Sequence, residues 1–371
     1  MAKIRLGILG ATGMAGRSAV IHEENLKQKG QDYASLELVT GSPQSQGKNL
    51  GEVFKEKERD LSTRYSFWDQ RSCPESYSQM KVHGLDAEKI SKKVDYVISA
   101  LPSAVAKEIE PKLRERGVNV FSNASEFRWK NDIPLIMPEV NPDQIKRVNE
   151  QSTKGVQVNN PNCTTAGFTP VLKALERFGL EKVNITTFQA ISGKGDKVSG
   201  SEYASNIKGN VVDDWNKRKQ YNGEEKKSEL EPVQILRGST DRQAAQKKGP
   251  DISVQTARVP TQFGHLESLK ITLSKKVDRE QVVDAIETWE PPEQVRELPT
   301  TSQTSLKHVQ EQPEPERHLH HGDGMGVVVG DIRQLDENRF SMFCLSHNLR
   351  QGATWKARQS MELYLKSKDL I

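Results

Sequence analysis

The chain has 371 residues, of which 34% are hydrophobic, and 54 basic against 50 acidic residues leave a formal net charge of +4. This length suits two domains with separate cores, and the small, interspersed charge gives no support to nucleic-acid binding. No apolar run approaches the ~20 residues of a membrane-spanning helix. Because Met1 to Ile4 leads straight into a strand pattern without a signal peptide, we expect a cytoplasmic protein.

The chain opens with a strand and a glycine-rich turn. Ile4 to Leu9 is interpreted as a buried strand, and a helical pattern follows as far as Lys27. Glycines stand at positions 10, 13 and 16. The first permits a tight turn, the second lets the backbone approach a pyrophosphate, and the third allows close packing of helix on strand. We therefore expect a dinucleotide-binding turn.

Alternating strands and helices continue beyond this turn and predict a doubly wound α/β domain. Val94 to Ala100 is expected to be a strand ending in the loop Leu101-Pro102-Ser103, which would line the cofactor crevice. The polar stretch Lys55 to Lys81 is interpreted as irregular. The other elements expected here are strands at Leu36 to Thr40 and Val118 to Phe121 and a helix at Ala104 to Arg116.

The residues after the second strand bear on cofactor choice. Dinucleotide-binding domains that prefer NAD usually carry an acidic residue there, whereas Thr40 to Ser45 contains none, which favours NADP. The same turn lacks the arginine or lysine that would pair with a 2′-phosphate. Ser42, Gln44, Ser45 and Lys48 are the candidates, and NAD stays open.

Cys163 is the strongest candidate for chemistry. A short extended run at Val156 to Val158 precedes it, and Thr164 to Phe178 carries apolar residues at helical spacing before Gly179. Amide donors and the helix dipole favour an anion at a helix N-terminus, so we expect a nucleophilic thiolate there at neutral pH. The alternative is a small buried hydrophobic residue. Cys73 and Cys344 are expected to be inert, since three widely spaced cysteines form neither a disulfide framework nor a metal site.

Arg258 and His265 flank a short connection between two expected strands. Arg258 ends one strand and His265 opens the next, so both side chains would lie at one rim. An arginine suits bidentate capture of a carboxylate, and a histidine near Cys163 is suited to acid-base chemistry. His318 to His321 lies in a polar, proline-rich segment that we interpret as a loop, and no metal site is predicted. The second-domain strands are expected at Val183 to Phe188, Ile252 to Ala257, Glu267 to Leu273, Gly326 to Asp331 and Arg339 to Leu345.

Several short motifs, taken together and in order, resemble aspartate-semialdehyde dehydrogenases of the archaeal and fungal branch over nearly the whole chain. They are Gly10 to Gly13, Phe121 to Ser125 with Arg128, Pro138 to Pro142, Asn160 to Thr165, Gln189 to Gly193, Arg258 to Pro260, Gly264-His265, Gly324-Met325, Val327 to Gly330 and Ser346 to Asn348.

The resemblance implies NADPH-dependent reduction of L-4-aspartyl phosphate to L-aspartate 4-semialdehyde, a step toward lysine, threonine, methionine and isoleucine. It makes Cys163 the nucleophile that forms a thioester, His265 the acid-base group and Gln189 the group orienting the acyl intermediate. It makes Arg258 the clamp on the α-carboxylate. The other implied substrate-binding residues are Arg128, Asn162, Glu225 and Lys227, of which Arg128 and Lys227 would meet phosphate and Glu225 the amine. The alternative for the charge run that contains Glu225 and Lys227 is a solvated helix face.

The implied cofactor residues are those of the glycine turn and of the loops around it. They are Gly10, Thr12, Gly13, Met14, Ala15, Gly16, Ser42, Gln44, Ser45, Ser99, Leu101, Pro102, Ser122, Asn123, Ser192, Gly193 and Asn348. The implied architecture is a Rossmann domain at 1–158, completed by a returning helix within 347–371, and a mixed α/β catalytic and dimerisation domain at 159–346. A homodimer or a tetramer of two dimers is expected.

The chain departs from the family pattern at three places. Lys194 and Asp196 stand where a small and an aromatic residue are usual, and Gln44 replaces a common arginine. Leu349 to Trp355 replaces a run of small residues near the nicotinamide, so Trp355 is expected to overfill that contact unless its neighbours move. Two other functions therefore stay open: a related acyl-CoA reductase, such as a malonyl-CoA reductase, and a weakly catalytic nucleotide-binding homologue.

Overall fold

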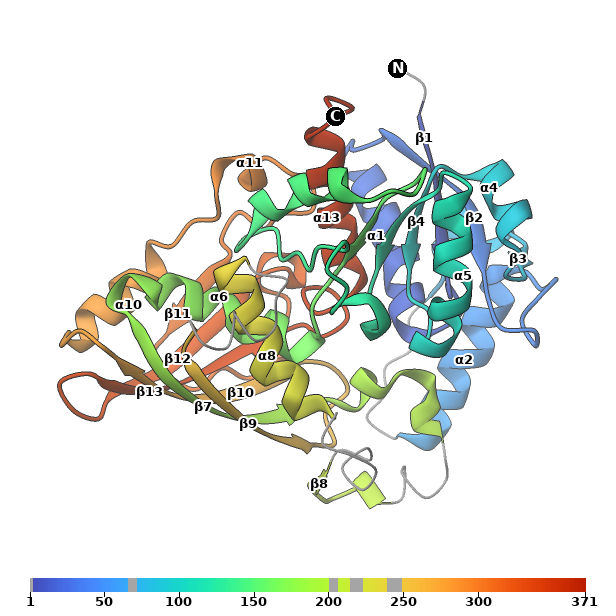
Figure 1. Cartoon of the computed structure of the whole chain (residues 1–371). Helices are drawn as coiled ribbons and strands as arrows, with labels where there is room; N and C mark the ends of the chain where they lie inside the picture. Colours follow the sequence, from blue (N-terminus) through green and yellow to red (C-terminus); the bar gives the residue numbers. More distant parts are fainter. Residues whose placement is uncertain (1–2, 66–71, 200–205, 214–222, 239–248) are drawn as a thin grey trace.

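The computed structural model describes residues 3–65, 72–199, 206–213, 223–238 and 249–371. They form two sheets of six and seven strands, and helix α13 (Thr354–Lys366) lies between the two halves of the molecule (Figure 1). No helix among these residues is long and apolar enough to cross a membrane. The mixed α/β architecture expected from the sequence is confirmed.

The first sheet is parallel throughout, in the order β3-β2-β1-β4-β5-β6. The chain adds strands outward in one direction from β1 to β3 and in the other direction from β4 to β6, and in such sheets the crevice at the carboxyl ends of β1 and β4 receives the ligand. The expected doubly wound fold is therefore confirmed. Its strands are β1 (Ile4–Leu9), β2 (Ala34–Thr40), β3 (Val82–His83), β4 (Tyr96–Ser99), β5 (Asn119–Ser122) and β6 (Gln157–Asn159).

Helices cover both faces of this sheet, and the longest of those that the sequence did not predict is α2 (Leu50–Arg64). The prediction of an irregular stretch from Lys55 is wrong, because Lys55 lies within this helix. A capping box between Asn49 and Glu52 starts this helix, and Val53, Phe54 and Leu61 are buried on one face. The others are α1 (Met14–Gln28), α3 (Glu75–Ser78), α4 (Ala87–Lys93), α5 (Ser103–Glu115), η1 (Ser125–Phe127) and η2 (Pro142–Glu150).

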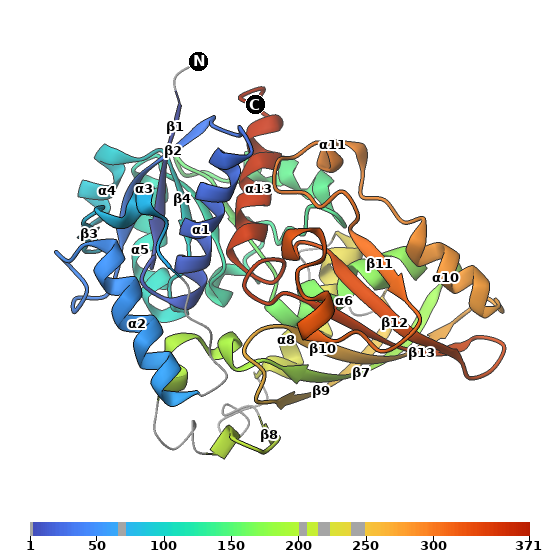
Figure 2. The ribbon, with the colours of Figure 1, turned by 180° about the vertical axis from the view of Figure 1, so that it is seen from behind.

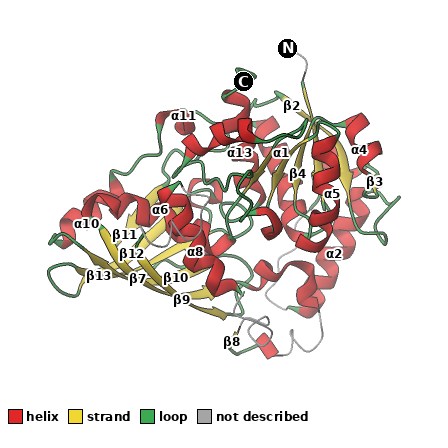
Figure 3. Ribbon diagram, in the orientation of Figure 1, coloured by secondary structure: helices red, strands yellow, loops and turns green. Residues whose placement is uncertain are grey.

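The second sheet is mixed, in the order β11-β12-β13-β10-β7-β9-β8. Helices α6 (Cys163–Leu175), α8 (Glu224–Arg237) and α10 (Arg279–Glu287) lie on one of its faces, and the described residues place no helix on the other (Figures 2 and 3). Its strands are β7 (Leu180–Gln189), β8 (Val212–Asp213), β9 (Asp251–Arg258), β10 (His265–Leu273), β11 (Leu306–Val309), β12 (Val327–Gln334) and β13 (Arg339–Ser346), and short turns of helix are η3 (Glu176–Phe178), η4 (Ile191–Ser199), α11 (Glu293–Arg296), α12 (Pro315–His318) and η5 (His321–Gly324).

Helix α13 is buried from Thr354 to Leu365 although it carries several charges. Arg358 donates to Glu23 (Nε to Oε1, 2.8 Å) and to the hydroxyl of Tyr33 (2.8 Å), and it also pairs with Glu362. Lys356 pairs with Glu139. Buried charges are tolerated only when paired and hydrogen-bonded, so these pairs dictate how α13 sits against α1 and the sheet.

Trp355 does not overfill the cofactor contact, contrary to expectation. Its side chain turns toward α1, where Nε1 donates to the carbonyl of Ser18 at 3.0 Å and the ring stacks on His22 with centroids 3.9 Å apart. Gly352 is the residue that approaches the site, since a Cβ there would lie 2.8 Å from Cβ of Cys163. The small residue needed at that contact is therefore present three positions earlier.

We predict that Arg358→Leu destabilises the protein by about 3 to 5 kcal/mol, because it leaves buried Glu23 and Glu362 without their cation. Urea unfolding followed by circular dichroism measures the effect. Arg5→Leu, which removes the exposed pair with Asp95, is the control and should leave the midpoint near that of the wild type. Equal midpoints for both variants would contradict the role given to the buried network.

Candidate active site

Cys163 is the first residue of α6, as the sequence predicts. Asn162 caps the helix, with its Oδ1 accepting from the backbone N–H of Thr164 at 2.9 Å. The backbone N–H of Asn162 donates to Glu231 of α8, which is fully buried. The nucleophile candidate thus stands on a helix end that both a cap and a neighbouring helix hold in place.

His265 lies beside this cysteine, with Nε2 3.2 Å from Sγ. It is the first residue of β10, where it pairs with Gln189 of β7 and Ser346 of β13. Its Nδ1 accepts from the backbone N–H of Ala190 at 3.1 Å. A neutral imidazole that accepts at Nδ1 carries its proton on Nε2, so the ring is a hydrogen-bond donor toward Sγ.

Arg258 ends β9, so the expected juxtaposition with His265 is confirmed. Its guanidinium is buried and donates from Nη1 to the carbonyl of Ala190 at 2.8 Å, while Nε has no partner among the described residues. A Cβ on Gly193 would come within 2.6 Å of Nη1 and 3.0 Å of Cε1 of His265, so a larger residue there would displace these side chains. An unsatisfied buried donor of this kind suits an anionic ligand.

Two threonine hydroxyls hold the side chain of Gln189 near the start of α6. Its Nε2 donates to the hydroxyl of Thr164 at 2.9 Å and to that of Thr187 at 3.3 Å. Its Oε1 has no hydrogen-bond partner among the described residues.

Glu224, rather than the expected Glu225, faces the site. Asn162 donates to Glu224 through Nδ2, and Lys227 lies 3.3 Å from it. Although burial opposes ionisation most strongly, Lys227, Asn162 and nearby cations lower the pKa of Glu224 to about 2. Glu225 instead accepts from the hydroxyl of Thr256 on β9. The glutamate and lysine are thus three residues apart, on one face of α8.

The guanidinium of Arg128 makes hydrogen bonds that hold neighbouring segments of the site together. Its Nη1 donates to Glu231 at 2.9 Å and its Nη2 to the carbonyl of Asn123 at 2.7 Å. Glu231 therefore joins Arg128 to the backbone of Asn162. Contact of Arg128 with a phosphate remains a prediction.

The expectation of a thiolate at neutral pH is wrong for the free site. Burial, followed by the charge of Glu224, raises the pKa of Cys163 to about 11. Burial, followed by Arg258, lowers the pKa of His265 to about 3. Both groups are thus neutral over the physiological range, and the helix N-terminus does not outweigh desolvation.

Lys194 adds a cation that the family pattern lacks. Burial, followed by Arg258, lowers the pKa of Lys194 to about 8, and Glu224, Lys227 and Cys163 are close enough to act on it. The side chain of Asp196, the other departure, lies outside the described part of the chain. Four residues beside the site were assigned no role from the sequence: Lys194, Glu224, Glu231 and Gly352.

The glycine turn has the geometry that a pyrophosphate needs. Gly10 has φ +75°, and a Cβ on Gly16 would lie 2.1 Å from the carbonyl oxygen of Gly10. Gly13 caps α1 without a side-chain hydrogen bond. The amides at the start of this helix, Met14 and Ala15 included, are thus suited to an anion, and the turn fits a dinucleotide. Thr12 is buried against Gly41, the residue after β2.

The loops around this turn agree with the expected cofactor residues only in part. Asn348 donates to Ser192 at 2.9 Å and accepts from the backbone of Gly264, which ties these loops together. Leu101 and Pro102 follow β4, and Asn123 donates to the carbonyl of Ser99. The side chains of Ser99 and Ser122 are fully buried beside Glu110 of α5, so neither is directed into the crevice, contrary to expectation.

The turn after β2 offers hydroxyl and amide groups rather than a cation. Ser42 and Gln44 are exposed, and Ser45 is buried 3.4 Å from the hydroxyl of Ser42. Lys48 pairs with Glu56 at 2.8 Å. Among the described residues, no three His, Cys, Asp or Glu side chains are placed to hold a metal.

Comparison with known proteins places this site in a family. Residues 5–148 match the NAD-binding domain of semialdehyde dehydrogenases and residues 170–351 match their dimerisation domain. The chain belongs to the semialdehyde dehydrogenase family. It is 30% identical to the aspartate-semialdehyde dehydrogenase of Archaeoglobus fulgidus over 98% of both chains, and 28% identical to a malonyl CoA reductase (NADP) of Metallosphaera sedula over 94% of this chain and 93% of the other.

A solved member of the family has the same fold. The crystal structure of aspartate semialdehyde dehydrogenase with NADP from Candida albicans superposes with a TM-score of 0.78, at 26% identity and with all of both chains covered.

We predict that alkylation of Cys163 by iodoacetamide in the free protein accelerates with pH well above pH 8, without a plateau below it, because its pKa is about 11. Glu224→Gln should shift the curve to lower pH, since it removes the second cause of the raised pKa. The control Glu225→Gln should leave the curve unchanged, because Glu225 accepts from Thr256 instead. Mass spectrometry of the Cys163 peptide separates this signal from the other cysteines. A plateau near neutrality would refute the neutral pair.

Proposed function

We propose that the protein catalyses NADP-dependent reduction of L-4-aspartyl phosphate to L-aspartate 4-semialdehyde with release of phosphate. The observation that carries this proposal is the 3.2 Å contact between Cys163 Sγ and His265 Nε2, at the N-terminus of α6 and beside buried Arg258. The family and its named relatives support the same reaction.

The residues around Cys163 have different roles in the first half-reaction. Sγ bonds to the acyl carbon while the carbon–oxygen bond to phosphate breaks and phosphate leaves with its electron pair. The thiol proton leaves with the departing phosphate, while Nε2–H of His265 donates a hydrogen bond to the sulfur and then to the developing oxyanion. Gln189 orients the thioester, and Asn162 positions the helix end. Breaking the carbon–sulfur bond after reduction releases the aldehyde and regenerates the thiolate.

Charged side chains around the cysteine match the charges of aspartyl phosphate. Arg258 would clamp the α-carboxylate, and Glu224 would meet the α-ammonium in place of the expected Glu225. Lys227 and Lys194 would meet phosphate, with Arg128 behind them. The ligand ammonium would offset the charge of Glu224, which is the second cause of the raised pKa of Cys163, so binding would favour ionisation of the thiol.

The glycine turn and the residues of 42–45 would hold NADP, which supplies the hydride when bound. The backbone of Gly10 to Gly16 fits the pyrophosphate, and Ser42, Gln44 and Ser45 would accept the 2′-phosphate without a cation. Use of NAD as an additional cofactor agrees with the lack of that cation.

A malonyl-CoA reductase is the second candidate, favoured by the similarity to the enzyme of Metallosphaera sedula. Its substrate has one carboxylate for Arg258 but no ammonium. The Glu224–Lys227 pair therefore supports the aspartyl substrate.

The match to a dimerisation domain supports a homodimer. We propose that the helix-free face of the second sheet forms its interface, with a tetramer of two dimers as the larger assembly. The domain division at 1–158 with 347–371 and 159–346, and a cytoplasmic location, belong to the same proposal.

We predict phosphate-dependent NADPH formation from aspartate semialdehyde, followed by absorbance, and its loss in Cys163→Ala by about four orders of magnitude or more, because the nucleophile is gone. Cofactor binding should stay near the wild-type value, since the thiol is no cofactor ligand. Activity with malonyl-CoA alone would favour the second candidate. Turnover retained in Cys163→Ala would contradict both.

We predict that KM for phosphate in this direction rises as pH passes about 8, because the cationic form of Lys194 is lost above its pKa. Lys194→Arg should remove the rise, since arginine stays charged, and Lys194→Met should give a high KM at every pH. Steady-state kinetics across this pH range provides the test. A pH dependence that persists in Lys194→Met would assign the effect to another group.

A further inference from the structure

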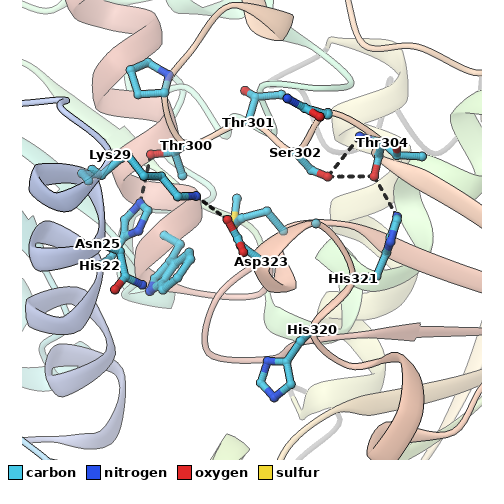
Figure 4. A pocket seen from close by; sticks show the side chains of 16 residues that line it. His22, Asn25, Lys29, Thr300, Thr301, Ser302, Thr304, His320, His321 and Asp323 are labelled. Carbon is cyan, nitrogen blue, oxygen red and sulfur yellow. Dashed lines mark hydrogen bonds and ion pairs between the residues drawn. The ribbon is translucent and has the colours of Figure 1, made fainter.

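One cavity lies away from the site already described. It has a volume of about 640 Å³ and lies between the second half of α1, the loop 299–304 and the loop 320–325 (Figure 4), and Trp355 is among its lining residues. Its residues in this first part of the chain run from His22 to Lys29, whereas the glycine turn precedes Met14. At 1.5 Å per residue, His22 lies roughly 12 Å along α1 from the turn, and Lys29, just after the helix, roughly 20 Å. The cavity is therefore separate from the cofactor crevice.

Polar groups of both signs line this cavity. Lys29 and Asp323 pair across its mouth and are both more than half exposed. Thr300, Thr301 and Ser302 contribute a hydroxyl-rich wall. One cation and one anion at a mouth match a ligand that carries both charges, rather than a phosphate or a metal ion, which would need charges of one sign.

A buried acceptor in the wall lacks a partner. The hydroxyl of Thr300 donates to Glu362 at 2.7 Å, so at 3.0 Å it accepts from Nε2–H of His22. That leaves Nδ1 of His22 as an acceptor, and nothing in the described part of the chain bonds to it, although the residue is 4% exposed. Burial, followed by Arg358, holds the pKa of His22 well below its usual value, so the ring stays neutral. A buried acceptor without a donor suits an N–H or O–H group of a ligand.

The loop that forms the opposite wall is conformationally unusual and leads to the catalytic cysteine. Asp323 has φ +58°, between two glycines that also have positive φ. Its carbonyl accepts from Arg350 at 2.6 Å, and that of Gly324 accepts from the backbone N–H of Gln351 at 3.3 Å. The next residue is Gly352, which abuts Cys163. Non-glycine residues with positive φ often mark binding sites or switches.

We propose that this cavity is a second ligand site, which binds a small zwitterion of the α-amino-acid class and acts on Cys163 through the segment 350–352. The ligand carboxylate pairs with Lys29, and its ammonium group pairs with Asp323. The occupant fixes the loop 322–325, and with it Gly352 against the thiol. Access to Cys163 therefore falls when the cavity is filled.

Isothermal titration calorimetry of the full chain with each protein amino acid in turn tests the binding. We expect at least one to bind, and Lys29→Met and Asp323→Asn each to weaken it about tenfold or more. Asparagine tolerates the positive φ of position 323, so the loop keeps its backbone. Lys27→Met, an exposed change on α1 outside the cavity, is the matched control and should leave binding unchanged.

Derivatives of the best-binding amino acid test the zwitterion requirement. Its N-acetyl form lacks the ammonium and its amide lacks the carboxylate, so both should bind about tenfold more weakly or not at all. Binding that ignores Lys29 and Asp323, or no binding by any amino acid, overturns the proposal. Binding that does not depend on Lys29 and Asp323 would mean that the amino acid is held in the catalytic site instead.

Iodoacetamide labelling of Cys163 tests the connection to the catalytic site without using activity. A saturating ligand should slow labelling about fivefold or more in the wild type and in Lys27→Met, but not in Asp323→Asn at the same concentration. An unchanged rate at saturation would overturn the coupling. Because neither readout needs turnover, failure here is distinguishable from failure of the proposed reaction.

Discussion

The ion pairs buried along α13 are the constraint on which the rest of the site depends. Arg358 and Lys356 cannot separate from their carboxylates without leaving unpaired charges in an apolar interior, so these pairs fix the position of the helix. In this position Gly352 lies against Cys163. The position also brings the backbone of Ala353 to Asn160, which accepts in turn from Ser360. Helix α13 is far from Cys163 in the sequence, yet it thereby helps to form one wall of the site around that residue.

The free site keeps its nucleophile neutral, and this follows from packing. Desolvation acts on Cys163 and His265 alike, raising the first pKa and lowering the second, while Arg258, Lys194 and Lys227 supply positive charge for an incoming anion. A thiol that ionises chiefly when substrate is bound is protected from other electrophiles and oxidants, which react with thiolates. Under the proposed binding mode, reactivity would then depend on a ligand ammonium that offsets the charge of Glu224.

Sequence patterns predicted the features that depend on local chemistry. The glycine turn, the helix that begins at Cys163 and the strand ends at Arg258 and His265 all follow from residue types at fixed spacing. Features that depend on distant partners were not predictable. Glu224 and Glu225 differ only in which helix face they occupy, and that is set where α8 begins. The partners of two charges in α13, Glu23 and Glu139, stand far away in the chain, so no local pattern pairs them.

The position of α13 at the end of the chain has a consequence for synthesis. Chains generally fold domain by domain from the N-terminus as they emerge, yet here part of the core of the first sheet comes from residues 354–366, which follow the second sheet in the chain. Gly352, which precedes α13, abuts Cys163. The site around Cys163 is therefore complete only after the strands of both sheets have been made.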